Sequence, residues 1–339
     1  MYRITFLLLA VLMQFKSLAI HKENKLPEFV EETDLYAFYS HFWLNMHHFL
    51  QQEVLMNQVK DSSVIASGIW NRMDNSEQKK WENAINFYKE TLVEKDLRMD
   101  DYMWAFKNWV TTQEMEVFAN VPDSFSIHCS HLQKVSGLYK KYFWEEHTAS
   151  NQEILDTYYT IIDSTEETVA AQLATLTRSF WQKEKIRVDI CYYAKSTRRN
   201  LRNRPYTSVE PTHVVMNSAN QMLAPKGNWI ELLYHEASHH LISSRSGFIG
   251  GTIIDVANVM GKKPPRSLWH AYLFYFSGII TQQLLIDFGI EDYKIYMLRN
   301  KVFTYYYPFL EQSLTLYMHH NITLHNATNS IITAYYEDR

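Results

Sequence analysis

The chain has 339 residues, of which 46% are hydrophobic and 15% aromatic, and it carries 33 Lys and Arg residues against 37 Asp and Glu residues. The hydrophobic fraction excludes a disordered chain, and the near balance of charges gives no basic excess that would indicate a nucleic-acid partner. Only 9 glycines argue against glycine-built nucleotide loops and turn-rich β-sandwiches, and only 2 cysteines exclude a disulfide-framework mini-protein.

The first 19 residues are predicted to be a secretory signal peptide. Arg3 precedes an apolar run over residues 4–13, and small residues stand at the −3 and −1 positions of a cleavage site after Ala19. The run is shorter than the about 20 residues of a membrane span, and a buried N-terminal helix is the alternative. We therefore expect a secreted or periplasmic protein with no membrane span after signal removal. An oxidising compartment would allow Cys129 and Cys191 to form a disulfide bond.

Four helices are predicted in the first region of the mature chain, residues 20–185. Apolar residues three and four positions apart predict amphipathic helices, the first of them rich in aromatic residues. In the last and longest, Ser150 is a plausible N-cap and Glu153 stands three positions on, as in a capping box. The four helices are expected over residues 34–58, 76–94, 100–119 and 150–183.

Two strands and three helices are predicted in the second region, residues 186–339. Alternating β-branched and aromatic residues predict a strand over residues 186–194, and a second short strand covers Thr212–Met216. Segment 195–204 between them carries five positive side chains and is expected to be a solvated loop, with anionic-ligand binding as the alternative. The predicted fold is α+β and predominantly α-helical, with a small mixed sheet preceded by a helical N-terminal half. The helices are expected over residues 229–243, 267–288 and 291–304.

The sequence LLYHEASHHLI contains the pattern H-E-x-x-H. On a helix, His235 and His239 lie one turn apart on the same face, so both imidazoles can bind one ion. Zinc prefers such nitrogen ligands, and Glu236 stands beside that face, where it can take a proton from water. Two histidines on an ordinary surface helix are the alternative. Asn228 is expected to cap this helix, with Glu231 reaching back to the cap.

The motif and the strands before it resemble the zincin metallopeptidases, over roughly residues 186–242 and a later helix that closes the site. The resemblance implies a zincin-like catalytic region in the second region of the chain. It implies that His235 and His239 bind one zinc ion and that Glu236 polarises the attacking water. It also implies that strand Thr212–Met216 is the edge of the sheet, against which an extended peptide would lie.

The third zinc ligand is predicted to be His270. The residues after His239 lack the Gly and His of the metzincin pattern, which excludes that subgroup. Gluzincin-like members take a Glu from a later helix, often with an acidic residue four positions on, whereas Phe274 stands four positions after His270. In the first turn of a helix capped by Ser267, the helix dipole favours the neutral, metal-binding imidazole. The other candidates are Asp255, Asp287 and Glu291.

These features together predict an exported zinc-dependent metallopeptidase that holds one Zn2+ ion and acts on a peptide or protein substrate, with Glu236 as general base. Two alternatives stay open: a non-catalytic, zinc-containing binding or surface protein, and a zinc hydrolase of a non-peptide bond. A phenol from a tyrosine cluster can stabilise the oxyanion, and the pattern does not select one. The cluster comprises Tyr293, Tyr296, Tyr305, Tyr306 and Tyr307.

Overall fold

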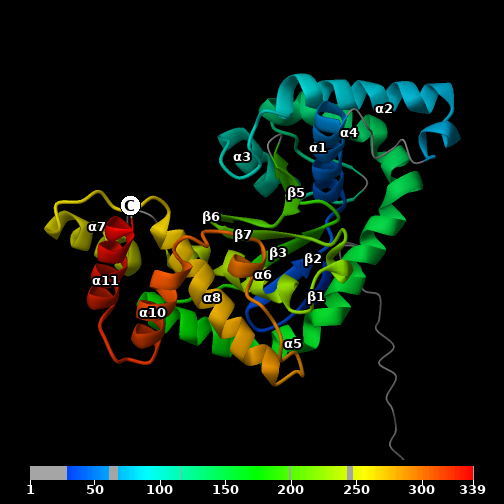
Figure 1. The fold of residues 1–339 in the computed structure, drawn as a ribbon. Coiled ribbons are helices and arrows are strands. Elements are labelled where there is room, and N and C mark those ends of the chain that lie inside the picture. Colours follow the sequence, from blue (N-terminus) through cyan, green and yellow to red (C-terminus); the bar gives the residue numbers. More distant parts are fainter. Residues whose placement is uncertain (1–28, 61–67, 116, 198–199, 243–246, 339) are drawn as a thin grey trace, which may run out of the picture.

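The computed structural model describes residues 29–60, 68–115, 117–197, 200–242 and 247–338, and Figure 1 shows their fold. The predicted signal peptide lies outside these residues. Helices dominate, and the strands form a five-stranded and a two-stranded sheet, so the fold is α+β and predominantly α-helical, as predicted. Within the described ranges, no helix has the length and apolarity to span a membrane.

The elements have the following bounds. The α-helices are α1 (Phe42–Lys60), α2 (Asn75–Phe87), α3 (Asp101–Val110), α4 (Ser126–Tyr139), α5 (Glu145–Thr177), α6 (Asn228–Ala237), α7 (Gly247–Val259), α8 (Leu268–Ile286), α9 (Tyr296–Arg299), α10 (Tyr307–Met318) and α11 (Leu324–Glu337). The strands are β1 (Phe29–Glu32), β2 (Tyr36–Tyr39), β3 (Ile186–Cys191), β4 (Lys195–Thr197), β5 (Asn200–Arg204), β6 (Tyr206–Val209) and β7 (Thr212–Asn217).

The main sheet is mixed and has the strand order β1-β2-β3-β7-β6. Strands β2, β3 and β7 run parallel, while β1 and β6 pair antiparallel at the two edges. The expected edge strand, Thr212–Met216, forms most of β7 and lies between β3 and β6, so that prediction is wrong. The true edge strand escaped the sequence pattern because Tyr206–Val209 is too short to show a period.

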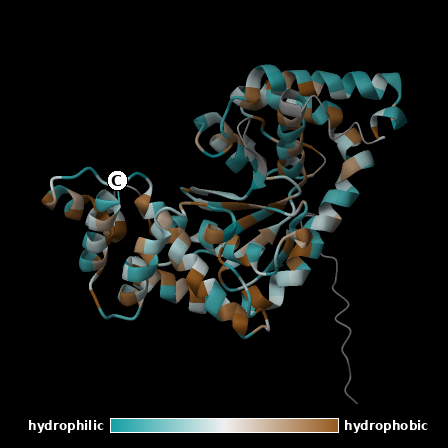
Figure 2. Cartoon of the chain, viewed as in Figure 1, coloured by the Kyte–Doolittle hydropathy of each residue, from teal (hydrophilic) through white to brown (hydrophobic). Residues whose placement is uncertain are grey.

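Helices cover both faces of the main sheet and bury two hydrophobic clusters. The first cluster joins one face to α5, α6, α7, α8, α10 and α11, and the second joins the other face to α1, α2, α3 and α4. Because successive side chains of a strand point to opposite faces, Val214 and Met216 of β7 enter the first cluster and Val215 enters the second. Figure 2 shows the result in hydropathy: α8 carries many brown residues and the strands mix brown with white and teal, whereas α2 at the periphery is mostly teal.

Both regions of the chain contribute to the sheet and to both clusters. Strands β1 and β2 come from the first region, and β2 pairs in parallel with β3 of the second. Helix α4, a π-helical segment (Lys140–Trp144) and α5 follow one another without interruption. In Figure 1 this continuous helical rod descends from the second cluster and passes below the sheet, where α5 packs on α8.

Several predicted helices differ from the structure at their ends. The aromatic stretch expected to be helical from residue 34 begins as strand β2, whose residues alternate between buried and half-buried, and only then continues as α1. Helix α5 begins at Glu145, so Ser150 lies inside it and is not its cap, and α5 ends where Arg178 adopts a left-handed φ of 49°. The helix expected over residues 100–119 ends at Val110, and that over 291–304 shrinks to α9.

The basic segment 195–204 is not a loop. Strands β4 and β5 pair antiparallel as a small ribbon beside the main sheet. The strand expected over residues 186–194 is confirmed as β3, although it ends at Cys191. The ribbon brings its two ends, Lys195 and Arg204, opposite each other.

The two cysteines form no disulfide bond. Cys129 on α4 and Cys191 on β3 are both free and buried in the second cluster. Burial raises the pKa of the Cys129 thiol to about 12 and holds that of Cys191 well above its usual range. Both thiols are therefore protonated packing groups rather than nucleophiles.

Candidate metal centre

Helix α6, which carries His235 and Glu236, follows a glycine that no other residue could replace unless neighbouring atoms moved. Gly227 has a φ of +87°, and a Cβ at this position would lie 2.3 Å from Cδ1 of Leu285. Every residue of α6 is buried. The motif therefore lies on an interior helix, and the alternative of an ordinary surface helix is wrong.

The polar residues at the start of α6 do not cap it as predicted. The Asn228 side chain accepts a hydrogen bond from Arg299 through Oδ1. Glu231 accepts hydrogen bonds from the Tyr293 hydroxyl and from the backbone N–H of Tyr296, the latter at 2.7 Å. Burial raises the pKa of Glu231 to about 7. These bonds tie α6 to the segment around α9 instead of closing its own first turn.

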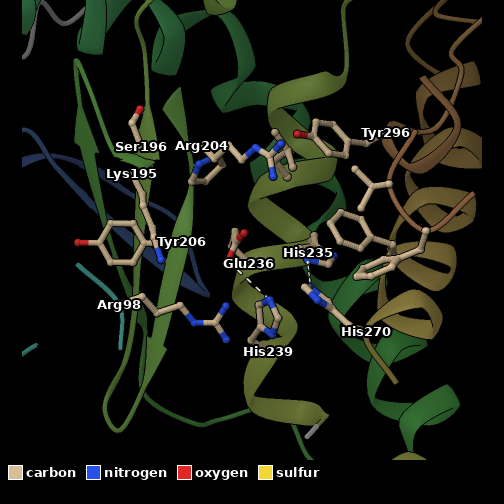
Figure 3. A pocket seen from close by; sticks show the side chains of 15 residues that line it. Arg98, Lys195, Ser196, Arg204, Tyr206, His235, Glu236, His239, His270 and Tyr296 are labelled. Atoms are coloured by element: carbon tan, nitrogen blue, oxygen red, sulfur yellow. Dashed lines mark hydrogen bonds and ion pairs between the residues drawn. The ribbon is translucent and has the colours of Figure 1, made fainter. Parts of the chain in front are cut away.

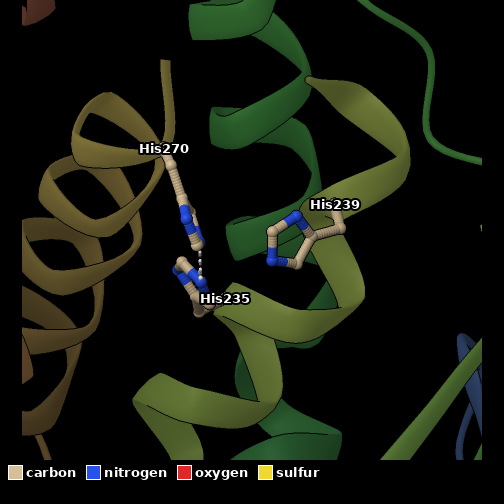
Figure 4. Close-up of side chains that lie close together, drawn as sticks. All are labelled: His235, His239 and His270. Atoms are coloured by element: carbon tan, nitrogen blue, oxygen red, sulfur yellow. Dashed lines mark hydrogen bonds between the residues drawn. The ribbon is translucent and has the colours of Figure 1, made fainter. Parts of the chain in front are cut away.

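The side chains of His235, His239 and His270 converge on one point (Figure 4). Each offers one ring nitrogen, and the three ligand atoms lie within 4.8 Å of one another. The Nε2 atoms of His235 and His270 are 3.1 Å apart, close to the ~3.3 Å expected of two nitrogen ligands on one tetrahedral zinc ion. The three imidazoles are therefore close enough to hold a metal ion.

The α-helical hydrogen-bond pattern stops between the two histidines of the motif. Helix α6 ends at Ala237, and His239 lies in a 3-10 turn, Ser238–Leu241. This turn is wound more tightly than an α-helix, yet the ring centroids of His235 and His239 are 5.0 Å apart. The spacing of the motif brings the two rings together despite the change of helix type.

His270 comes from the first turn of α8, as predicted, but the expected cap is absent. Ser267 adopts a left-handed φ of 61°, and its side chain makes no capping hydrogen bond. Aromatic rings hold the imidazole instead. Trp269 stacks on it with ring centroids 4.9 Å apart, and Phe303 meets it edge-on at 5.4 Å.

Phe274 lies one turn after His270 on α8 and packs flat on His235. The ring centroids are 3.7 Å apart and the planes differ by 22°. The Nδ1 atom of His235 is buried and has no hydrogen-bond partner among the described residues. Metal-binding histidines usually donate from this outer nitrogen to a carboxylate or carbonyl, which fixes the ring. Stacking on Phe274 fixes the ring of His235 here.

All three imidazoles are neutral at pH 7. Burial lowers the pKa of His270 to about 4 and holds the pKa values of His235 and His239 well below their usual range. The positive charge of Arg98 acts in the same direction on each of them. Because neutral imidazole is the metal-binding form, the cluster needs no deprotonation to accept an ion.

Glu236 lies beside the imidazoles and is held by the edge strand. Its Oε2 atom is 3.7 Å from Nε2 of His239. The hydroxyl of Thr207 on β6 lies 2.9 Å from that same Oε2 and 2.8 Å from the backbone carbonyl oxygen of Glu236. Burial raises the pKa of Glu236 to about 7, and a divalent cation beside it would lower that pKa. The carboxylate is thus oriented toward the space that the ring nitrogens face.

A cavity of about 340 Å³ opens over these residues (Figure 3). Its walls come from α6 and α8 on one side and from β4, β5 and β6 on the other. The turn before α3 adds Arg98, a residue of the helical first region. The charged side chains among its described lining residues are Arg98, Lys195, Arg204 and Glu236.

The other candidates for a third ligand lie elsewhere. Asp255, Asp287 and Glu291 are all exposed, and none is among the described residues that line the cavity. Of the predicted tyrosine cluster, Tyr296 lines the cavity. The hydroxyls of Tyr293, Tyr306 and Tyr307 bond to Glu231, to the Arg266 carbonyl and to Glu311, and Tyr305 is 53% exposed.

Sequence reasoning missed Arg98 and Tyr206, which line the cavity, and Thr207, which bonds to Glu236. Arg98, Tyr206 and Thr207 belong to a turn and to a short strand, neither of which has a periodic signal. The hydroxyl of Tyr206 points away from the cavity in Figure 3 and lies 2.9 Å from Nε2 of His48 on α1. His48 is therefore a packed residue that connects the helical first region to the edge strand.

Comparison of the chain with protein-family models, with curated proteins and with solved structures finds no significant match.

Proposed function

We propose that this chain is an exported, zinc-dependent metallopeptidase with a zincin-like catalytic region. The observation that carries the proposal is the convergence of three neutral imidazoles, from His235, His239 and His270, beside the carboxylate of Glu236 in one cavity. Three nitrogen ligands, an open fourth position and an adjacent carboxylate are the equipment of catalytic zinc sites in hydrolases. Export is supported by the sequence of residues 1–19.

Each residue of the centre has one task in this reaction. His235, His239 and His270 hold the ion through their ring nitrogens. When bound, zinc supplies Lewis acidity, which polarises a carbonyl and lowers the pKa of water toward about 7. Oε2 of Glu236 accepts a proton from the attacking water and passes it to the leaving amine nitrogen. Thr207 orients that carboxylate through its hydroxyl.

Strand β6 supports a peptide as the substrate. It forms one edge of the main sheet, and no further strand of the described residues pairs with its outer side. Pro205 and Tyr206, where β6 begins, line the cavity. An extended peptide can add to such an edge through backbone hydrogen bonds. A scissile peptide bond carried along β6 would then pass the carboxylate that Thr207 holds.

Metal content and peptide cleavage test the proposal in sequence. Elemental analysis of the purified protein should find about one zinc per chain. A digest of a broad peptide library, followed by mass spectrometry, should show cleavage that a chelator abolishes and added zinc restores. Zinc binding without cleavage of any peptide would favour a zinc-containing binding protein or a hydrolase of another bond, and absence of bound metal would contradict the centre itself.

The general base has its own test. Glu236→Gln keeps the size of the side chain but removes the proton acceptor, so the zinc content should stay at one per chain while kcat falls by about a hundredfold or more. Glu167→Gln, on the exposed face of α5, is the matched control and should leave kcat at the wild-type value. Unchanged turnover by the Glu236→Gln protein would contradict the assignment.

A further inference from the structure

The cavity carries more positive charge than the proposed chemistry uses. Among its described lining residues, Arg98, Lys195 and Arg204 face a single carboxylate, that of Glu236. A bound divalent cation would add to this excess. Lys195 is paired with Asp96 at 2.6 Å, but hydrolysis of a neutral peptide bond calls for neither Arg98 nor Arg204, and uncompensated charge in a partly buried cavity is costly. The excess therefore points to an anionic group on the substrate.

Arg98 is held in place by its backbone while its guanidinium is left without an acceptor. Oδ1 of Asp96 accepts hydrogen bonds from the backbone N–H groups of Arg98 at 2.9 Å and Met99 at 3.0 Å, which fixes the turn. Asp96 forms its ion pair with Lys195, at 2.6 Å. Within the part of the chain that the structure describes, the Arg98 guanidinium has no hydrogen-bond or ion-pair partner. Figure 3 shows it pointing into the cavity beside His239.

Arg204, at the end of β5, also has an N–H group that lacks an acceptor. Its Nε atom is buried and has no hydrogen-bond partner among the described residues. Buried donors in proteins nearly always have an acceptor. Figure 3 places the Arg204 guanidinium beside Tyr296, on the other side of Glu236 from Arg98. Among the described residues, the Arg98 guanidinium without a partner and the Arg204 guanidinium with an unpartnered Nε thus lie on either side of the carboxylate that would act as general base.

We infer that the enzyme selects peptide substrates that place a carboxylate in this cavity, bound by the guanidinium of Arg98 or Arg204. The inference rests on the proposed function. A guanidinium group binds a carboxylate through two parallel N–H···O bonds, a geometry that neutral groups cannot match. The carboxylate is either the C-terminus of the peptide or an Asp or Glu side chain near the scissile bond.

This assignment also gives the helical first region a role in the site. Arg98 belongs to that region, and the Asp96–Lys195 ion pair fastens its turn to the ribbon of β4 and β5. The ribbon in turn supplies Lys195 and Arg204 from the basic segment 195–204. Anionic-ligand binding, the alternative for that segment, is therefore extended here to a carboxylate that Arg98 or Arg204 binds.

Four peptides of one cleavable sequence test the inference on the zinc-loaded protein. The first has neutral side chains and a free C-terminal carboxylate, and the second is its C-terminal amide. The third is the amide with one Glu near the scissile bond, and the fourth has Gln in its place. We expect kcat/KM for one acid, either the C-terminal acid or the Glu peptide, to exceed that of its neutral partner by about tenfold to a hundredfold, the range of charge-assisted hydrogen bonds.

Variants then assign the selectivity to residues. Arg98→Gln or Arg204→Gln should bring the acid-to-neutral ratio down toward one, and the corresponding Lys variant should restore part of it because the charge remains. Arg72→Gln removes an exposed arginine that is not among the described residues lining the cavity, so its ratio should stay at the wild-type value. Equilibrium binding of the same four peptides to the zinc-loaded Glu236→Gln protein gives the ratio without turnover.

The outcomes separate the two proposals. Cleavage of acid and neutral peptides at equal rates leaves a peptidase and overturns the inference. If no peptide is cleaved, the peptidase proposal fails and the binding ratios decide alone. Equal binding of acids and neutral peptides then overturns the inference as well, whereas tighter binding of an acid that Arg98→Gln or Arg204→Gln abolishes supports it.

Discussion

In the candidate metal centre, Phe274 takes the place of a hydrogen bond to His235. It stacks on His235 at 3.7 Å between ring centroids, on the imidazole whose Nδ1 has no hydrogen-bond partner among the described residues. The orientation of the His235 imidazole therefore depends on packing rather than on an acceptor. A stacked ring is held by the shape of the side chain that it packs on. The orientation of the His235 imidazole should therefore change when Phe274 is replaced by a side chain of another shape.

Phe274→Leu should weaken metal binding without unfolding the protein. The substitution keeps an apolar side chain but removes the flat surface, and loss of an orienting partner typically costs tenfold to a hundredfold in metal affinity. Competition with a chromogenic chelator measures the dissociation constant. Phe276→Leu, two positions along α8 and buried in the first cluster, is the control. Equal losses in both variants would show general destabilisation and contradict a specific role for Phe274.

The centre divides into residues that local spacing predicts and residues that it cannot. His235, Glu236 and His239 follow from one helical turn. His270 follows from a helix start at a plausible distance, although its cap was predicted wrongly. Arg98 has no such signal, because its place at the cavity depends on how the helical first region packs against the ribbon.

At the scale of elements, α6 depends on the conformation of the residue before it. Gly227→Ala should destabilise the protein by about 2–4 kcal/mol, from an unfavourable left-handed φ together with steric overlap. That overlap arises because the new Cβ would lie 2.3 Å from Leu285 Cδ1. Urea unfolding followed by circular dichroism measures the change.

Gly261→Ala separates the two causes. Gly261 also has a positive φ, +64°, but a Cβ there would meet nothing within 4 Å. This variant should therefore lose only about 1 kcal/mol, the cost of the left-handed backbone. Equal losses at both positions would mean that the space beside Leu285 plays no part.

Length alone did not make an element predictable, because α4, α7, α10 and α11, of 12 to 14 residues each, were not predicted. Helix α8 and strand β3 carry long, regular patterns, and both were found close to their observed bounds. Strand β2 was taken for the start of a helix because large aromatic residues suit either structure. Strand β6 has four residues, too few for a period, and its omission put the edge of the sheet on the wrong strand.

At the scale of the whole molecule, the helical first region and the edge strand meet at a buried lysine. Lys107 of α3 is 1% exposed and donates a hydrogen bond of 2.7 Å to the Ser208 hydroxyl on β6. Burial lowers its pKa to about 7, and the neighbouring Asp189 opposes that shift while Arg187 adds to it. The Lys107 ammonium group therefore titrates near neutral pH in the folded protein.

The stability of the protein should rise with pH above 7 because of this residue. The folded-state pKa lies below the unfolded value of about 10.4, so the unfolded chain binds more protons between these values and unfolding becomes costlier as pH rises. The contribution should reach about 2 kcal/mol between pH 7 and pH 9. The measurement is the difference in unfolding free energy between wild type and Lys107→Met at each pH, which cancels other titrating groups. A difference that stays constant over this range would show a lysine charged throughout.

The continuous rod of α4, the π-helical segment and α5 has a consequence for any attempt to shorten the protein. One end of it lies in the second hydrophobic cluster and the other in the first. Separating the two regions would expose apolar side chains of one half to solvent. It would also remove α5, which packs on α8 and so supports His270, from the other half. The smallest unit that can assemble this centre is thus built from both halves of the sequence.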